Sequence, residues 1–280
     1  MMIRKWMALL AAAVLLLTAV AAVAEEPAGP DLSKVPEFLF TSYKDGLGLG
    51  PCPIYTAPNT ELGYRVGRAT CDTDSRVYVA GRDASGWLLV RYATNDKGAR
   101  VGYIPHNNLK GFKADNNLSF SYITCEAPFD IAITDNPLDA ASSFAVIPQG
   151  GVYAILAKYT YYGDWWYVET KIDGLYARGF IPRTTQLLPT ERTVVEIPDM
   201  SAFPEASPEG EPLQGTVTVI GDACLVRKDA GTDFEWVARA KSYDIFPYYG
   251  TKTGTNNHPW YHVCVDGVWG WIAGPLVRPN

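Results

Sequence analysis

The most constraining feature of this chain is a pattern that occurs three times after residue 50. Each occurrence begins with a short apolar segment, passes through a turn to a strand carrying a Trp, and ends in Gly, an aromatic residue and Ile. The strand tryptophans are Trp87, Trp165 and Trp260, and the closing triplets are 102–104, 179–181 and 270–272. The opening residues Tyr55, Ile133 and Val226 precede those tryptophans by 32, 32 and 34 residues. A period this even indicates tandem copies of one small structural unit.

Short apolar–polar alternations separated by turn residues recur through all three copies. They predict strands over 76–80, 87–92 and 101–104 in the first copy, and over 151–158 and 165–169 in the second. Beyond the N-terminal apolar run, no segment keeps the 3.6-residue apolar period of a helix. The sequence therefore predicts an all-β protein.

The first 24 residues have the layout of a secretory signal peptide. Arg4 and Lys5 precede an apolar run over 7–23, and Ala22-Val23-Ala24 forms an A-x-A cleavage site. An uncleaved membrane anchor is the alternative, although the run is near the lower length limit for spanning a bilayer. Cleavage after Ala24 predicts an exported chain with no stable membrane insertion.

Composition then divides the remainder into segments. A polar, Pro-rich leader over 25–37 is predicted to be disordered. Copy one spans 38–112, copy two 118–188 and copy three 213–280, and a linker rich in Pro and Glu over 189–212 separates copy three from the others. This linker predicts that copy three moves relative to copies one and two.

The best-defined copy carries a family resemblance. Val-Arg-Lys-Asp-Ala-Gly over 226–231, Trp-Tyr-His-Val over 260–263 and Gly-Trp-Ile over 270–272 together resemble the bacterial SH3-like domain. Copy one is close to this pattern, whereas copy two departs most, with Asp164 in place of the Gly before the strand Trp. The resemblance implies three tandem SH3-like β-barrels, a fold that commonly recognises peptidoglycan peptides. Such small barrels also host many unrelated functions.

Aromatic residues are the candidate ligand contacts, since 8 Trp and 17 Tyr exceed what small cores need. Strand alternation places Trp87, Trp165 and Trp260 opposite the inward apolar sets of their strands. They are predicted to form stacking platforms for a sugar or peptide; the alternative is packing under a loop or against a neighbouring copy. Four further tyrosines fall where the resembled fold has the loop beside its ligand groove: Tyr161, Tyr162, Tyr248 and Tyr249.

Five cysteines in an exported chain suggest disulfides, with one thiol left over. Cys52 with Cys71 and Cys224 with Cys264 are the candidate pairs, although strand alternation turns Cys264 away from Cys224. Cys125 is expected to be a buried free thiol. No zinc-type Cys spacing or hydrolase motif occurs, so we expect no metal, no cofactor and no catalytic residues.

Charge limits the partners. The formal charge of −6 becomes −8 once Arg4 and Lys5 are removed, and an acidic surface disfavours nucleic acid. The sequence thus predicts an exported, non-catalytic binding or adaptor protein associated with the cell envelope, with peptidoglycan peptide or glycan as its ligand. The alternative is an extracytoplasmic protein–protein interaction scaffold that has no glycan ligand.

Overall fold

The computed structural model describes residues 29–45, 50–73, 75–94, 98–109, 117–139, 142–221 and 224–280. Their regular structure consists of β-strands and three short 3₁₀ turns, without an α-helix, which confirms the predicted all-β class. No helix in these ranges has the length and apolar character that crossing a membrane requires. The predicted signal peptide, residues 1–24, lies outside the described residues.

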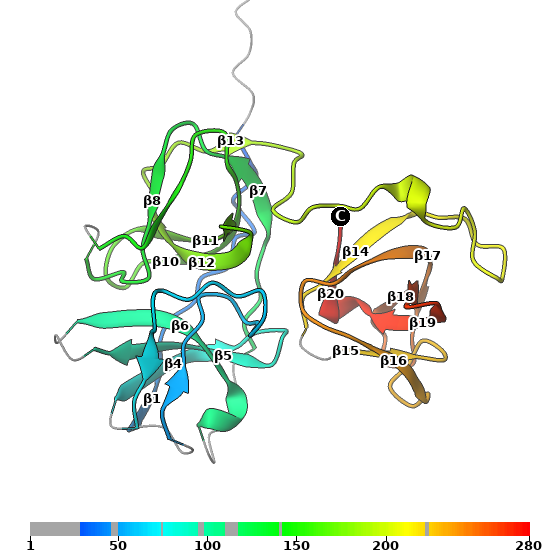
Figure 1. Cartoon of the computed structure of the whole chain (residues 1–280), viewed down its shortest axis with the longest axis horizontal. Helices are drawn as coiled ribbons and strands as arrows, with labels where there is room; N and C mark the ends of the chain where they lie inside the picture. Colours follow the sequence, from blue (N-terminus) through cyan, green and yellow to red (C-terminus); the bar gives the residue numbers. More distant parts are fainter. Residues whose placement is uncertain are drawn as a thin grey trace, which may run out of the picture.

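The strands fall into the three predicted copies. Copy one contains β1 (Ser42–Asp45), β2 (Cys52–Pro53), β3 (Thr70–Cys71), β4 (Arg76–Arg82), β5 (Trp87–Ala93), β6 (Ala99–Pro105) and η1 (His106–Asn108). Copy two contains β7 (Ile123–Glu126), β8 (Ile131–Ile133), β9 (Ala145–Ile147), β10 (Val152–Tyr159), β11 (Trp165–Ile172), β12 (Leu175–Pro182) and β13 (Leu188–Pro189). After η2 (Met200–Ala202) come β14 (Gly215–Val219), β15 (Cys224–Arg227), β16 (Trp236–Ala240), β17 (Ile245–Thr253), β18 (Pro259–Val265), β19 (Val268–Ala273), η3 (Gly274–Leu276) and β20 (Val277–Pro279) of copy three. Figure 1 shows copies one and two stacked, with copy three beside them.

Each copy is built around a three-stranded antiparallel meander, namely β4–β5–β6, β10–β11–β12 and β17–β18–β19. The strand Trp lies on the middle strand of each meander. The first strand carries a β-bulge at the same relative place in all three copies, between Val79 and Gly81, Ile155 and Ala157, and Tyr248 and Gly250. The strand order of every sheet is linear, and in the described ranges none closes by hydrogen bonds into a complete barrel.

Steric contact explains why the closing triplet of each copy begins with Gly. The opening segment of the copy crosses directly over it, through the bridges Tyr55–Tyr103, Thr134–Phe180 and Arg227–Trp271. A Cβ atom on Gly102 would lie 2.3 Å from Ile54 Cγ2, and one on Gly179 or Gly270 would lie 2.7 Å from Ile133 Cγ1 or the Arg227 carbonyl oxygen. Any side chain there would displace the crossing segment, so the Gly-aromatic-Ile triplet marks a close backbone approach.

The two faces of each meander have different partners. In β5, Leu88 and Val90 enter the core of copy one, whereas Trp87 and Leu89 enter a second apolar cluster. That cluster, which we call the shared core, also receives Trp165 and Phe180 of copy two. Copies one and two therefore bury the outer faces of their meanders against each other.

The predicted disorder of the leader 25–37 is wrong for its described part. Val35 is buried in the core of copy two, and Leu32 packs against the same cluster. Glu37 pairs with Lys158 in a parallel bridge, and the Phe38 ring stacks on Tyr159 with their centroids 5.4 Å apart. Leu32, Val35 and Phe38 hold this polar segment in place, because each of them packs on an apolar surface of copies one and two.

The predicted mobility of copy three is also not what the structure shows. Val194 and Val195 of the linker 189–212 are buried in the shared core. Beyond the linker, the Tyr243 ring of copy three stacks on Tyr176 of copy two, with centroids 3.7 Å apart and planes within 8°. Asn59 Nδ2 of copy one donates to the Ser242 carbonyl oxygen at 3.1 Å. Copy three is therefore docked on both of its neighbours.

Candidate functional site

The three strand tryptophans point away from the cores of their own copies, as the alternation predicts, yet all three are buried. Trp87 packs in the shared core, edge-on to the Tyr55 ring at 5.9 Å. Trp260 is 1% exposed, and its indole N–H donates to Asn256 Oδ1 at 3.0 Å in the hairpin loop above it. For these two residues the expected open platform is wrong, and the alternatives of packing against a neighbouring copy or under a loop hold instead.

Trp165 differs because it also borders open space. It lines a groove on copy two, which we call the copy-two groove, with a volume of about 250 Å³. The lining residues are Phe129, Asp130, Ile131, Ala132, Thr134, Ser143, Trp165, Pro182, Thr184 and Thr185. Phe129 is 51% exposed, so about half of its side-chain surface is open to solvent at the groove.

The polar groups of this groove are suited to recognition. The hydroxyl side chains of Ser143, Thr184 and Thr185 line the groove together with the two aromatic rings. The buried indole N–H of Trp165 has no hydrogen-bond partner among the described residues. Aromatic faces beside hydroxyls can stack on a sugar or peptide and hydrogen-bond to its edges.

The four loop tyrosines separate into two pairs. Tyr161 and Tyr162 are exposed, contact each other edge-to-face at 4.5 Å, and line a different cavity at the junction of copies one and two. Tyr249 is fully buried against Trp269, with ring centroids 4.9 Å apart. Tyr248 is partly buried and packs edge-on to Tyr261 at 5.2 Å. The predicted place of Tyr248 and Tyr249 in a loop beside a ligand groove is therefore wrong, because both lie in β17 and take part in the internal packing of copy three.

All five cysteines are free thiols in the structure. Cys52 and Cys71 are nevertheless direct cross-strand partners on β2 and β3, and burial raises their pKa values to about 11 and about 12. Cys224 is buried in the core of copy three, whereas Cys264 lies on the other face of β18 and pairs with Trp269. Cys125 is buried, and desolvation raises its pKa to about 11.

A buried charge cluster joins the three copies, and we call it the three-copy hub. At its centre, Arg178 of copy two donates from Nε to Glu169 Oε2 at 2.9 Å. Its Nη1 donates to Asp83 Oδ2 at 3.2 Å and to the Tyr103 hydroxyl at 2.9 Å, both in copy one. Copy three contributes Tyr243, whose hydroxyl donates to Glu169 Oε2 at 2.9 Å.

The hub is almost free of solvent, since the side chains of Arg178, Glu169 and Asp83 are at most 3% exposed. Burial raises the pKa of Asp83 to about 6, against the opposing effect of the Arg178 charge. Tyr243 adopts φ 72°, a conformation that costs about 1–2 kcal/mol outside glycine. Strain of this size persists only where surrounding contacts fix the residue, so the hub is a structural junction between the copies.

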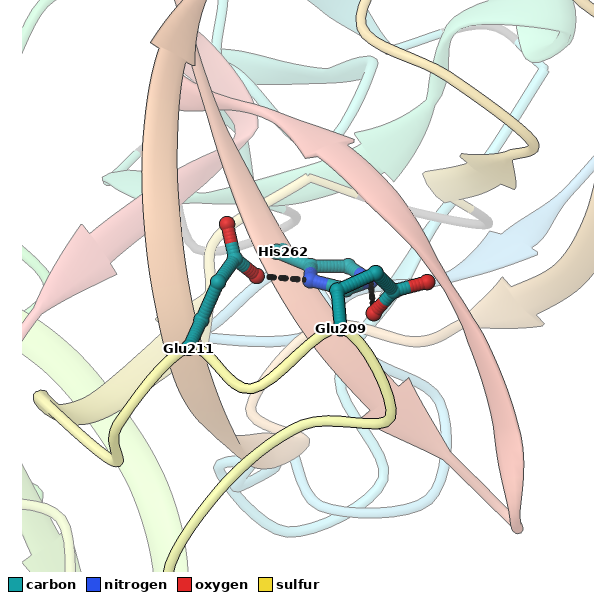
Figure 2. A group of neighbouring side chains, drawn as sticks. All are labelled: Glu209, Glu211 and His262. Carbon is teal, nitrogen blue, oxygen red and sulfur yellow. Dashed lines mark hydrogen bonds and ion pairs between the residues drawn. The ribbon is translucent and has the colours of Figure 1, made fainter.

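A second polar cluster was not predicted from the sequence. Figure 2 shows Glu209 and Glu211, from the linker, on opposite sides of the His262 ring of β18. Glu211 hydrogen-bonds to Nδ1, and a Glu209 oxygen lies 3.8 Å from Nε2. The imidazole is stacked on Trp271, with centroids 4.8 Å apart.

Metal binding is the first chemistry to test for such a group, because its ligand atoms lie within 4.8 Å of one another. A metal ion, however, is held by only one nitrogen of an imidazole. An ion at Nε2 would have Glu209 as its second ligand, while Glu211 would only orient the ring through Nδ1. Two protein ligands are fewer than zinc sites use. The arrangement is better suited to holding the linker against copy three. Its two contacting segments lie about 50 residues apart in the sequence, so no local motif indicates the cluster.

Comparisons with protein-family models and with curated proteins gave no match.

Proposed function

We propose that this chain is an exported, non-catalytic binding protein of the cell envelope, made of three SH3-like units, and that the copy-two groove holds its ligand. The observation that carries this proposal is a groove lined by the exposed Phe129 ring, by Trp165 and by the hydroxyl side chains of Ser143, Thr184 and Thr185. The bacterial SH3-like motifs and the N-terminal signal pattern support an envelope location. Peptidoglycan peptide or glycan is the proposed ligand, since both offer stacking faces and hydrogen-bonding edges.

The pull-down of the purified protein on peptidoglycan sacculi tests this proposal. Phe129→Ala removes an exposed ring, so folding stability should change little, whereas binding should weaken by about 1–2 kcal/mol, or roughly 5- to 30-fold. Phe234→Ala is the matched control, because Phe234 is also exposed, at 37%, and lies in copy three outside the groove. Equal binding by wild type and Phe129→Ala, or no binding by wild type, would contradict the proposal.

The second candidate function is a protein-interaction scaffold without a glycan ligand. It is favoured by the shared core and the three-copy hub, in which the copies use their outer faces to bind one another. Under this alternative, sacculi would not retain the protein. Cross-linking in the extracytoplasmic compartment would instead yield a defined protein partner.

A further inference from the structure

The junction of copies one and two contains a second cavity, which we call the junction cleft. Its volume is about 260 Å³, and three separate segments line it. Phe40 comes from the leader side, Tyr78 and Arg91 from β4 and β5, and Tyr159, Tyr161 and Tyr162 from the end of β10 and the turn after it. The cleft therefore exists only when copies one and two are packed together.

Among the residues that the structure describes, Arg91 is the only charged one lining this cleft. Its guanidinium carbon lies 4.5 Å from the ring centroid of Tyr78 and 5.0 Å from that of Tyr162. The Phe40 ring is 5.9 Å away, so aromatic faces hold the side chain from more than one direction. These contacts fix a planar cation against aromatic walls and restrict its rotamers.

The Arg91 side chain has no hydrogen-bonded or ion-paired partner among the described residues. Within the described ranges, no carboxylate pairs with its guanidinium and no acceptor takes a hydrogen bond from it. Arg100, Arg178, Arg183 and Arg192 each contact an acid, whereas Arg65 and Arg239, which also lie over aromatic rings, resemble Arg91 in having none among the described residues; Arg91 differs from these two in lining the cleft. Arg91 is thus a cation held among aromatic rings in a chain with a net charge of −6. Such a cation can attract an anionic group of a ligand.

We propose that the junction cleft binds the carboxylate of a ligand through Arg91, with Tyr161 and Tyr162 covering the adjoining apolar or ring portion. A guanidinium presents two parallel N–H donors that match a carboxylate. The cleft is small for a whole ligand but large enough for the end of a chain. Two sources share this chemistry, namely the C-terminus of a peptide and a uronic acid at the end of a glycan. This inference is independent of the copy-two groove.

Isothermal titration of the purified protein with three probes tests the proposal: acetyl-Tyr-Ala-Ala with a free carboxylate, the same peptide as its C-terminal amide, and trigalacturonic acid. The free acid or the uronate should bind at least tenfold more tightly than the amide, and added salt should reduce that difference. Preference for the peptide acid would identify a peptide C-terminus, and preference for the uronate would identify a glycan end. Equal binding of all three probes would overturn the proposal.

Variants separate this site from general charge attraction. Arg91→Gln should reduce binding of the acid probe to the level of the amide, while Arg239→Gln should have no effect. Arg239 is the matched control because it also lies over an aromatic ring, 5.1 Å from the Trp236 centroid, but outside the cleft. Tyr161→Ala should weaken binding without loss of folding, since Tyr161 is 68% exposed. If Arg91→Gln and Tyr161→Ala both bind like wild type, the proposal is wrong.

Phe129→Ala distinguishes this proposal from the proposed function. It should weaken binding to sacculi and leave the titration of the acid probe unchanged. Retained acid binding in a protein that does not bind sacculi would overturn the copy-two groove alone. Loss of acid binding in Phe129→Ala would show that the two depressions are one site, and would overturn the independence of the junction cleft.

Discussion

The strand Trp is covered in two different ways, one in copies one and two and the other in copy three. Trp87 and Trp165 are buried in one aromatic cluster that two copies build together. Trp260 is covered by the hairpin of its own copy and hydrogen-bonds to Asn256 there. The repeated motif therefore specifies the meander and its outer ring, but not what covers that ring.

This difference also explains where open surface remains. The shared core buries the outer faces of copies one and two, and the depressions among the described residues border it; the copy-two groove and the junction cleft are two of them. Copy three closes its outer face with Trp260 and Tyr249, both fully buried. Ligand sites are thus expected at the edges of packed copies rather than at one equivalent position in each.

The largest expected effect comes from truncating the strand tryptophans. Trp87→Ala and Trp260→Ala should each cost about 3–5 kcal/mol of folding free energy, because both remove a large buried ring. Loss of Trp87 should destabilise copies one and two together, while loss of Trp260 should act on copy three alone. Hydrogen exchange resolved by segment checks this, since amides of the affected copy should exchange faster.

The opposite pattern of hydrogen exchange would contradict the distinction between copy three and copies one and two. If Trp260→Ala accelerated exchange throughout copies one and two, copy three would be an integral part of one cooperative unit. Phe234→Ala serves as the control, since loss of an exposed ring should leave all three copies protected.

A second prediction concerns pH and the three-copy hub. Burial raises the pKa of Asp83 to about 6 from 3.8, so the folded protein binds this proton more tightly than the unfolded chain. Protonation of Asp83 therefore contributes fully to the free energy of unfolding below about pH 4. This contribution, roughly 3 kcal/mol, is lost as pH rises through about 6. Denaturant unfolding of wild type and Asp83→Asn between pH 4 and 7 checks this.

The sign of the pH effect is decisive. Relative to Asp83→Asn, wild type should lose free energy of unfolding as pH rises over this range. If wild type instead gained stability relative to Asp83→Asn, the Arg178 ion pair would outweigh desolvation, and the hub would behave as an ordinary salt bridge.

Much of the fold could be predicted from the sequence because its determinants are local. Strand alternation predicts strands of the meanders and the face of each Trp, whereas the crossing of each opening segment over its closing glycine is known only from the structure. Docking of the leader and linker could not be predicted in the same way. Leu32, Val35, Val194 and Val195 are few apolar residues in polar, Pro-rich segments, and their burial depends on surfaces formed far away in the chain.

The sites were less predictable for a related reason. Strand alternation says which way a ring points, but not whether another copy covers it, so Trp87 and Trp260 were assigned to an exposed face. Tyr161 and Tyr162 are visible in the sequence as adjacent aromatic residues in a turn, and their contact with a ligand stays a prediction. Phe129 and Arg91 have no such local signal, because the other lining residues of their depressions are brought near them only by packing.

The smallest expected effect is at the contact of copy three with copy two. Tyr243→Phe keeps the stack on Tyr176 but removes the hydroxyl that donates to Glu169 at 2.9 Å. Arg178 still donates to the same Glu169 oxygen, so the cost should be about 1 kcal/mol, the low end for a buried acceptor losing a donor. Weaker docking should expose the linker 189–212 and speed its proteolysis by about fivefold when cleavage follows the open population. Tyr161→Phe is the control, since the Tyr161 side chain is 68% exposed and lines the junction cleft rather than this contact. Equal cleavage rates in wild type and Tyr243→Phe would mean that the ring stack alone holds copy three, and that the hub hydroxyl contributes nothing to its docking.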